Sequence, residues 1–99
     1  MSRQNSRFEW DPLKARTNIA KHGIDFNSAI EAFSDPSNLV EYDDGPHDEE
    51  RWRLTGFSAR RLLYVVFVEP DDDVVRIISA REANRHEQDR YFRQALPKG

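Results

Sequence analysis

The chain of 99 residues contains no cysteine. This absence excludes a disulfide framework and zinc sites built on thiolates, and it fits a protein of the reducing cytoplasm. The longest apolar run, residues 62–68, is far too short to span a bilayer. Residues 1–7 are polar, so we expect a flexible N-terminal tail rather than a signal segment there. The nucleophile elbow, the P-loop, the HExxH motif and the dinucleotide fingerprint are also missing, which leaves those enzyme classes without support.

Charge is distributed unevenly along the chain, whose formal net charge is -3. Residues 1–24 carry five basic and two acidic side chains, and residues 76–99 carry six basic and three acidic ones. Residues 25–50 carry nine acidic and no basic side chains. The net charge alone argues against a nucleic-acid partner, but a basic patch forms if the two ends meet in the fold. Two solvated helix surfaces would explain the same basic residues without a partner.

Two helices are predicted in the first third of the chain. Asp11 suits an N-cap, Pro12 suits the first helical position, and Gly23 suits the left-handed residue that follows a helix. Asp25 is suited to cap a second helix, which the segment 34–36 (Ser-Asp-Pro) ends. The apolar face of this second helix is formed by Phe26, Ala29, Ile30 and Phe33. The short connection predicts a helical hairpin.

The middle of the chain is predicted to form strands. Their expected bounds are residues 8–10, 39–42, 50–58, 61–69 and 74–80. Turns at 59–60 and 70–73 join the last three strands, which predicts an antiparallel meander. Residues 62–68 are all apolar, so both faces of that strand should be buried. The helical hairpin can cover one face, and the other needs the C-terminal helix or a partner.

A C-terminal helix is predicted from a capping-box pattern in which Ser79 is the N-cap and Glu82 is the third helical residue. It runs to about Ala95. The predicted fold class is therefore α+β, an antiparallel β-meander sheet with an N-terminal helical hairpin and a C-terminal helix. A single domain is expected over residues 8–95, with tails at 1–7 and 96–99.

Three cations stand out as candidates for phosphate chemistry. His22 lies in the last turn of the first predicted helix, where the macrodipole favours the imidazolium and so a general acid. Lys21 beside it can neutralise a phosphate, although both are also ordinary residues for the end of a helix. Arg81 falls in the first turn of the last predicted helix, where exposed N–H groups favour an anion. Its planar fork suits phosphate, and a salt bridge to a carboxylate in the same layer is the alternative.

The remaining charged residues have weaker signals. Arg76 lies within an apolar strand, where an ion pair with Glu69 or Glu87 is the favoured explanation. Solvation and contact with an RNA backbone both remain open for the arginines of the predicted hairpin, which are Arg51, Arg53, Arg60 and Arg61. The acidic loop at 43–49 contains His47, but its spacing matches no ligand pattern, and we predict no metal site.

An ordered set of segments over residues 8–92 resembles the BrnT family of toxins. The set comprises Phe8-Glu9-Trp10-Asp11-Pro12, Lys14, Asn18, Lys21-His22-Gly23, Phe26, Phe33, Asp35-Pro36, Glu50-Arg51, Gly56-Phe57-Ser58, Arg76-Ile77-Ile78-Ser79-Ala80-Arg81, Glu87 and Tyr91. No single motif is specific to the family; the specific feature is the order of the whole set.

The resemblance implies a toxin of a bacterial type II toxin–antitoxin system, with a RelE-like ribonuclease fold. Such a protein is expected to be a cytoplasmic, metal-independent endoribonuclease that needs no cofactor and leaves a 2′,3′-cyclic phosphate. It cleaves RNA, inhibits translation, and is neutralised by a BrnA-type antitoxin. Contact with DNA is expected only indirectly, through the antitoxin.

Within this resemblance, catalysis is assigned to His22, Lys21, Arg81 and Glu87. In this hypothesis Glu87 orients Arg81 or Arg76, or serves as a second proton carrier. RNA binding is assigned to Arg51, Arg53, Arg60, Arg76 and Tyr91. The last helix departs from the family pattern, because it starts with Glu82-Ala83-Asn84 where the family often has basic residues.

Two other functions are kept as alternatives. One is a catalytically inactive, toxin-like interaction module that binds an antitoxin and takes part in operon autoregulation. The other is a DNA-binding domain, which is disfavoured because no predicted helix has a dense basic face with base-reading Asn or Gln.

Overall fold

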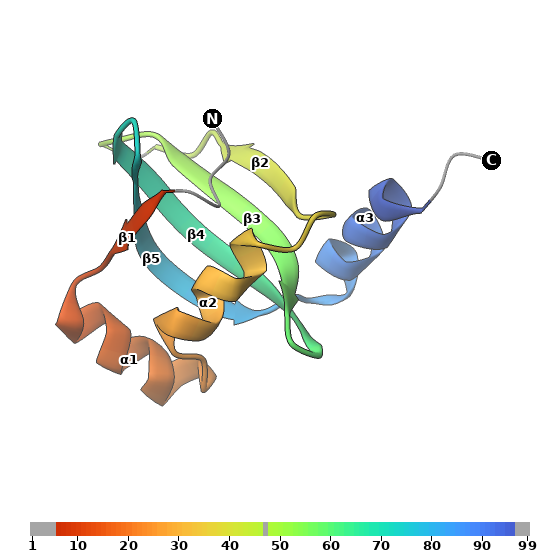
Figure 1. Cartoon of the computed structure of the whole chain (residues 1–99), viewed down its shortest axis with the longest axis horizontal. Helices are drawn as coiled ribbons and strands as arrows, with labels where there is room; N and C mark the ends of the chain where they lie inside the picture. The colour runs from red at the N-terminus through yellow and green to blue at the C-terminus, as the bar shows by residue number, and fades with distance from the viewer. Residues whose placement is uncertain (1–5, 47, 97–99) are drawn as a thin grey trace.

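The computed structural model describes residues 6–46 and 48–96. The described strands are β1 (Arg7–Glu9), β2 (Leu39–Asp43), β3 (Arg51–Ser58), β4 (Arg61–Asp71) and β5 (Val74–Glu82). The described helices are α1 (Pro12–His22), α2 (Phe26–Phe33) and α3 (Arg85–Ala95). Figure 1 shows α1 and α2 together on one side of the sheet, with α3 at its end. None of the described helices is long and apolar enough to cross a membrane.

The strands form one mixed sheet in the order β1-β5-β4-β3-β2. Neighbouring strands from β2 to β5 are antiparallel, as the predicted meander requires. The prediction of a purely antiparallel sheet is wrong, however, because β1 pairs with β5 in parallel. β1 pairs with the edge of β5 only from Val74 to Arg76. The implied relation to RelE-type ribonucleases stays a prediction.

The predicted ends of α1 and α2 are confirmed. The Asp11 side chain accepts a hydrogen bond from the N–H of Leu13 at 2.8 Å, and Gly23 has a left-handed backbone with φ of 69°. The Asp25 side chain accepts from the N–H of Ser28 at 2.7 Å and caps α2. These ends are set by contacts between residues only a few positions apart, and such local signals can be read in the sequence.

The core lies between α2 and the sheet. Phe33 of α2 packs edge-on against Phe8, with ring centres 5.0 Å apart, and against Phe67, at 5.1 Å. α2 approaches β3 so closely that a Cβ atom on Gly56 would lie 2.6 Å from the carbonyl oxygen of Ala32. Glycine is therefore required at this position.

The junction between β5 and α3 differs from the prediction. β5 does not end at Ala80 but runs to Glu82, which pairs with Leu63 of β4. The capping box is made by Asn84 and Glu87, not by Ser79 and Glu82. Pairing with β4 continues the ladder past the predicted helix start, and this long-range contact is not visible in the local pattern.

Other strand ends shift by one or two residues. β1 begins at Arg7, inside the predicted tail, and β3 begins at Arg51 rather than residue 50. β2 and β4 run further than predicted, to Asp43 and Asp71. The predicted tails otherwise fall largely outside the described residues, as does His47 of the acidic loop.

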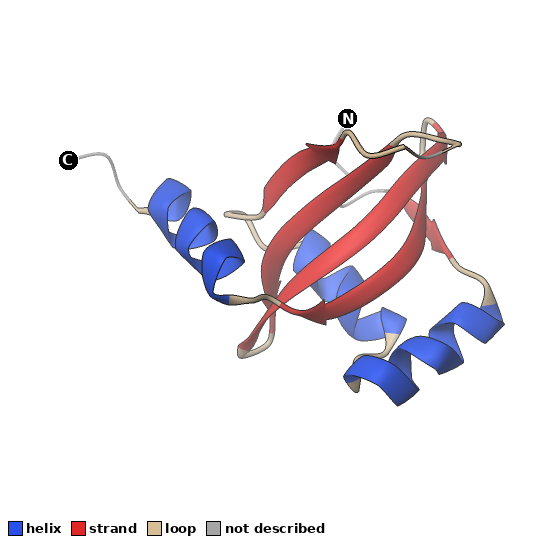
Figure 2. Ribbon diagram, turned by 180° about the vertical axis from the view of Figure 1, so that it is seen from behind, coloured by secondary structure: helices blue, strands red, loops and turns tan. Residues whose placement is uncertain are grey.

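One face of the sheet is only partly covered. Seen from behind, no described helix crosses the centre of the β3-β4-β5 surface, because α3 lies at its end (Figure 2). α3 packs against β3, so it covers only part of this face. We call this surface the open face and define it by Arg51, Arg53, Thr55, Tyr64, Val66, Ser79 and Arg81. Its β4 residues are still largely sheltered: Tyr64 is 7% exposed.

Polar contacts hold α3 in place. The hydroxyl of Tyr91 donates to Asp35 at 2.6 Å, and Nε2 of Gln94 donates to the carbonyl of Ser37 at 2.6 Å. An ion pair between Arg90 and Glu41 of β2, at 3.2 Å, adds a further contact. These contacts from the later turns of α3 fix the helix, and with it Glu87 in its first turn, beside the open face.

Candidate functional site

Cross-strand pairing gathers polar side chains from three neighbouring strands on the open face. Tyr64 of β4 lies directly opposite Thr55 of β3 and Arg81 of β5. Directly paired residues of an antiparallel sheet share a face, so these three side chains form a row across it. Arg53 lies opposite Val66 and is therefore a diagonal neighbour of Tyr64, within reach of a long side chain.

The Arg81 side chain is held from two sides. Its terminal nitrogens donate to the two carboxylate oxygens of Glu87, each at 2.8 Å. Its Cζ atom lies 4.4 Å from the centre of the Tyr64 ring, a cation–π contact. A bidentate pair fixes direction as well as distance. The Arg81 side chain is nevertheless 36% exposed, so a ligand can reach it.

Glu87 is placed to orient Arg81. Burial raises the pKa of the Glu87 carboxyl, but hydrogen bonds from Arg81 and from the N–H of Asn84 lower it more, and the net pKa lies below the ordinary 4.5. Hydrogen bonding to Glu87 raises the pKa of Arg81, against the effect of burial. Both groups are therefore ionised at neutral pH. Both carboxylate oxygens accept from Arg81, and a pKa below 4.5 makes Glu87 a weak base at neutral pH, which favours the orienting role over that of a second proton carrier.

Two arginines of β3 extend the cationic part of the open face. Nη2 of Arg53 donates to the carbonyl of Tyr42 at 3.2 Å. Burial lowers the pKa of Arg53, but hydrogen bonding to Tyr64 and nearby carboxylate charges raise it more. The Nε atoms of Arg51 and Arg53 are buried without an acceptor among the described residues. Because such a donor costs about 1–3 kcal/mol, stability alone does not favour arginine at these positions.

Lys21 and His22 lie at the end of α1, beside β5. Both are exposed, and they line a cavity of about 310 Å³ between α1 and β5 together with Ser79. Ser79 also belongs to the open face, two residues before Arg81. Ser79 therefore borders both the cavity that Lys21 and His22 line and the open face.

Arg76 is paired differently from the prediction. Its Nε atom lies 2.7 Å from Glu9 of β1, whereas Glu69 and Glu87 were the predicted partners. The parallel pairing of β1 with β5 places Glu9 directly opposite Arg76. This partner depends on the one parallel contact that the sequence did not reveal.

The other predicted RNA contacts lie at the far end of β3. Arg60 is exposed in the turn between β3 and β4. Tyr91 is only 4% exposed, and its hydroxyl is used within the fold by Asp35. Arg60 thus presents its charge to solvent, whereas Tyr91 contributes to the attachment of α3.

Tyr64 is a site residue that sequence reasoning missed. It contacts Arg81 through its ring and interacts with Arg53 through its hydroxyl. The available signal was the residue type: within the apolar run 62–68, Tyr64 is the residue whose side chain carries a polar atom. Its cross-strand neighbours, however, could not be known without the register of the sheet.

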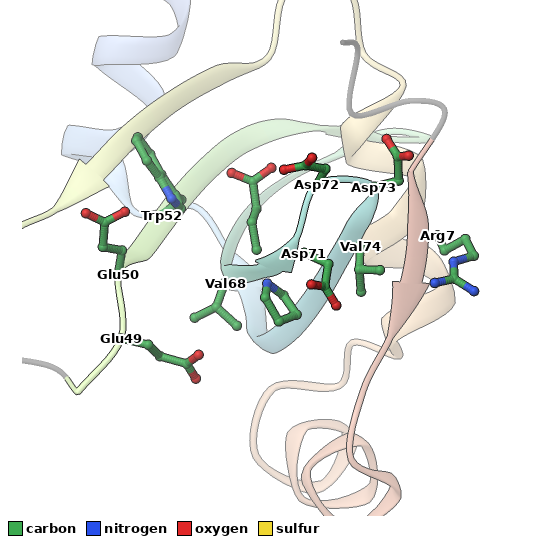
Figure 3. Close-up of a pocket in the computed structure, with 11 residues that line it drawn as sticks. Arg7, Glu49, Glu50, Trp52, Val68, Asp71, Asp72, Asp73 and Val74 are labelled. Atoms are coloured by element: carbon green, nitrogen blue, oxygen red, sulfur yellow. The ribbon is translucent and has the colours of Figure 1, made fainter.

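A larger cavity, of about 980 Å³, lies at the opposite end of the sheet (Figure 3). Its acidic lining residues are Glu49, Glu50, Glu69, Asp71, Asp72 and Asp73. This charge repels a phosphate backbone, and the cavity includes none of the predicted catalytic residues. Within residues 6–46 and 48–96, no group of three or more acidic or histidine side chains is placed to hold a metal ion.

Comparisons with known proteins agree on one family. Residues 10–87 match the family model described as the ribonuclease toxin BrnT of a type II toxin–antitoxin system. A crystal structure of the Brucella abortus ribonuclease toxin BrnT is similar, with a TM-score of 0.64 and 28% identity. The match covers 81% of this chain and 99% of that chain. No curated protein sequence matches. The chain therefore belongs to the BrnT family of ribonuclease toxins of type II toxin–antitoxin systems.

Proposed function

We propose that this protein is a metal-independent endoribonuclease that acts on RNA in the bacterial cytoplasm. The observation that carries the proposal is the pairing of Arg81 with Glu87 and Tyr64, two residues along β5 from a cavity lined by Lys21 and His22. This arrangement offers fixed positive charge and one titratable imidazole near the same strand. These are the groups that phosphodiester cleavage by an internal hydroxyl requires.

The proposed reaction begins with attack of the substrate 2′-oxygen on the adjacent phosphorus. The 2′-hydroxyl loses its proton, the O2′–P bond forms, and the P–O5′ bond breaks, which leaves a 2′,3′-cyclic phosphate. His22 either protonates the leaving 5′-oxygen as general acid, while water accepts the 2′-proton, or accepts the 2′-proton as general base, while water protonates the 5′-oxygen. Arg81 and Lys21 stabilise the additional negative charge of the phosphorane. Glu87 keeps the guanidinium of Arg81 in position.

The open-face arginines Arg51 and Arg53 are proposed to bind the RNA backbone, with further contact from Arg60 and Arg76. Of these, Arg53 has the strongest structural support, because the Tyr64 hydroxyl connects it to the Arg81 contact. Arg76 is half-exposed and already paired with Glu9, so its contribution to RNA binding should be smaller.

Inhibition by a cognate BrnA-type antitoxin is proposed from the family alone, since the family is described as part of a type II toxin–antitoxin system. Cleavage of RNA would then halt translation whenever the antitoxin is lost. Contact with DNA would arise only through the antitoxin.

A second candidate is a toxin-like module that binds the antitoxin without cleaving RNA. One observation favours it: both terminal nitrogens of Arg81 are already occupied by Glu87. A phosphate must therefore share the guanidinium with this carboxylate or displace it.

A cleavage assay separates the two candidates. Purified protein is incubated with end-labelled RNA in the presence of a chelator, and the product ends are identified. Cleavage with cyclic phosphate ends, reduced about 100- to 1,000-fold in Arg81→Ala and His22→Ala, supports the endoribonuclease. Arg16→Ala on α1 is the control, because Arg16 is exposed and lies outside the cavity beside β5. A soluble wild type that leaves RNA intact would favour the binding module.

A further inference from the structure

A continuous groove follows α1 along β5. Beside the 310 Å³ cavity at Lys21 and His22 lies a second cavity of about 550 Å³, and the two share Lys14 and Ile78. The second cavity extends to Trp10 at the start of α1. We call the combined channel the α1 groove and define it by Trp10, Lys14, Lys21, His22, Ile78 and Ser79. The proposed function assigns a role to Arg76 at the Trp10 end of this groove, but none to Trp10 or Lys14.

The free charges along the α1 groove are positive. Lys14 and Lys21 form no ion pair with the described residues. The acidic residues of the groove are already engaged: Glu9 pairs with Arg76, and Asp11 caps α1. Lys14 and Lys21 are seven residues apart on one helix face, about 10 Å along the axis. Two cations at this interval suit a repeating anion such as a nucleic-acid backbone.

Trp10 supplies a flat aromatic surface at the end of this track. Its ring packs edge-on against Phe26, with ring centres 5.8 Å apart at 75°. This packing holds the half-buried ring in one orientation. Leu13, which also lines the groove, is 63% exposed and adds apolar surface between the cations. A fixed aromatic ring next to a basic track is the usual arrangement for binding single-stranded nucleic acid.

We propose that the α1 groove binds single-stranded RNA, with an unpaired base stacked on Trp10 and a backbone phosphate bound by Lys14. The strand then continues toward Lys21 and His22, where the proposed function places cleavage. The inference rests on that function and adds two binding residues and a substrate class. RNA in a duplex is disfavoured, because its stacked bases cannot lie on the Trp10 ring. An acidic protein segment is the competing occupant.

Intrinsic fluorescence can report binding at Trp10 directly. The chain has two tryptophans, and Trp52→Phe leaves Trp10 as the single reporter. The probe is a short single-stranded oligoribonucleotide made non-cleavable by 2′-O-methyl groups. Its binding should quench Trp10 fluorescence, and the same sequence in a duplex should quench it much less. This readout leaves Trp10 itself in place, so it does not depend on a variant that changes the Phe26 contact.

Two variants measure the contributions by fluorescence anisotropy of the labelled oligonucleotide. Trp10→Leu should bind about 5- to 150-fold more weakly, the range found for loss of one stacked base. A plot of log affinity against log salt has a negative slope, and Lys14→Gln should make it less steep by about 0.7, which corresponds to the loss of one phosphate contact. Arg16→Gln is the matched control, because it removes one exposed charge from α1 outside the groove and should leave the slope unchanged.

The outcomes separate this inference from the proposed function. Wild type that cleaves RNA, with quenching of Trp10 and the expected losses in both variants, supports both. Wild type that cleaves RNA while Trp10 fluorescence and the salt slope of Lys14→Gln stay unchanged overturns the groove assignment only. Quenching by an acidic peptide but not by the oligonucleotide also overturns it, in favour of a protein occupant. Wild type that neither cleaves nor binds RNA overturns both.

Discussion

Asn18 of α1 pairs with Ala80 of β5 through both ends of its side-chain amide. The Ala80 N–H donates to Oδ1 at 3.0 Å, and Nδ2 donates to the Ala80 carbonyl at 2.7 Å. Nδ2 also donates to the carbonyl of Ile24 at 2.9 Å. The amide thus takes the place of a neighbouring strand at the edge of β5, beyond the short stretch that β1 covers. Asn18 is 5% exposed, and the position of α1 depends on it.

Replacing Asn18 by alanine should therefore destabilise the protein. Asn18→Ala leaves the polar groups of Ala80 and the carbonyl of Ile24 without their partners, and we expect the free energy of unfolding to fall by about 2–4 kcal/mol. Urea unfolding followed by circular dichroism measures this change. Asn27→Ala removes an exposed asparagine of α2 and should change stability by less than about 0.5 kcal/mol. Equal effects of the two substitutions would contradict the bridging role of Asn18.

The ion pair of Glu87 with Arg81 should make stability depend on pH. The folded pKa of Glu87 lies below its ordinary value of 4.5. Its contribution is therefore complete above about pH 4.5 and is lost as the pH falls through the folded pKa. Glu87→Gln should lower the free energy of unfolding at pH 7 by about 1.5–3 kcal/mol and flatten its decline below pH 4.5. Parallel stability profiles of wild type and variant from pH 7 to pH 3 would contradict this.

The Tyr91 hydroxyl should lose its proton only at an unusually high pH. Burial and the hydrogen bond to Asp35 raise its pKa from 10.0 to about 12. Because the folded pKa is the higher one, this contact stabilises the fold below about pH 10, and its contribution is lost as the pH rises toward 12. In a spectrophotometric titration of the three tyrosines, one phenolate signal should appear only near pH 12. Tyr91→Phe should remove that signal; loss of a signal near pH 10 instead would count against the assignment.

Replacing Ala59, in the turn between β3 and β4, by glycine should stabilise the protein. Ala59 has a φ of 53°, and within the described residues it is the non-glycine residue with a positive φ. The left-handed backbone is unfavourable for a residue with a Cβ atom. Ala59→Gly should raise the free energy of unfolding by about 0.5 kcal/mol, less than the strain itself, because glycine also gives the unfolded chain more freedom.

The same substitution inside a helix is the control for Ala59. Ala20→Gly, at an exposed position of α1, should lower the free energy of unfolding by about 0.5–1 kcal/mol. Chemical denaturation of both variants tests the opposite signs. A lower stability of Ala59→Gly than of wild type would exclude strain at this turn.

The ends of the two N-terminal helices could be predicted because their signals are local. The caps at Asp11, Gly23 and Asp25 act over three or four residues, and each lies where the sequence indicates. The start of α3 could not be predicted in the same way. Ser79 and Glu82 have the spacing of a capping box, but extended pairing with β4 keeps both of them in β5.

The candidate site, too, could be predicted only in part. The sequence itself supplied the chemical types: a lysine and a histidine at a helix end, arginines on alternate positions of one strand, and Arg81 at the end of the family-like segment 76–81. Which of them meet was decided by the tertiary structure. Strand register places Arg81 over Tyr64, and the rigid attachment of α3 brings Glu87 to it. The physical reason is range: caps and turns depend on near neighbours, whereas register and ion-pair partners depend on contacts between segments far apart in the chain.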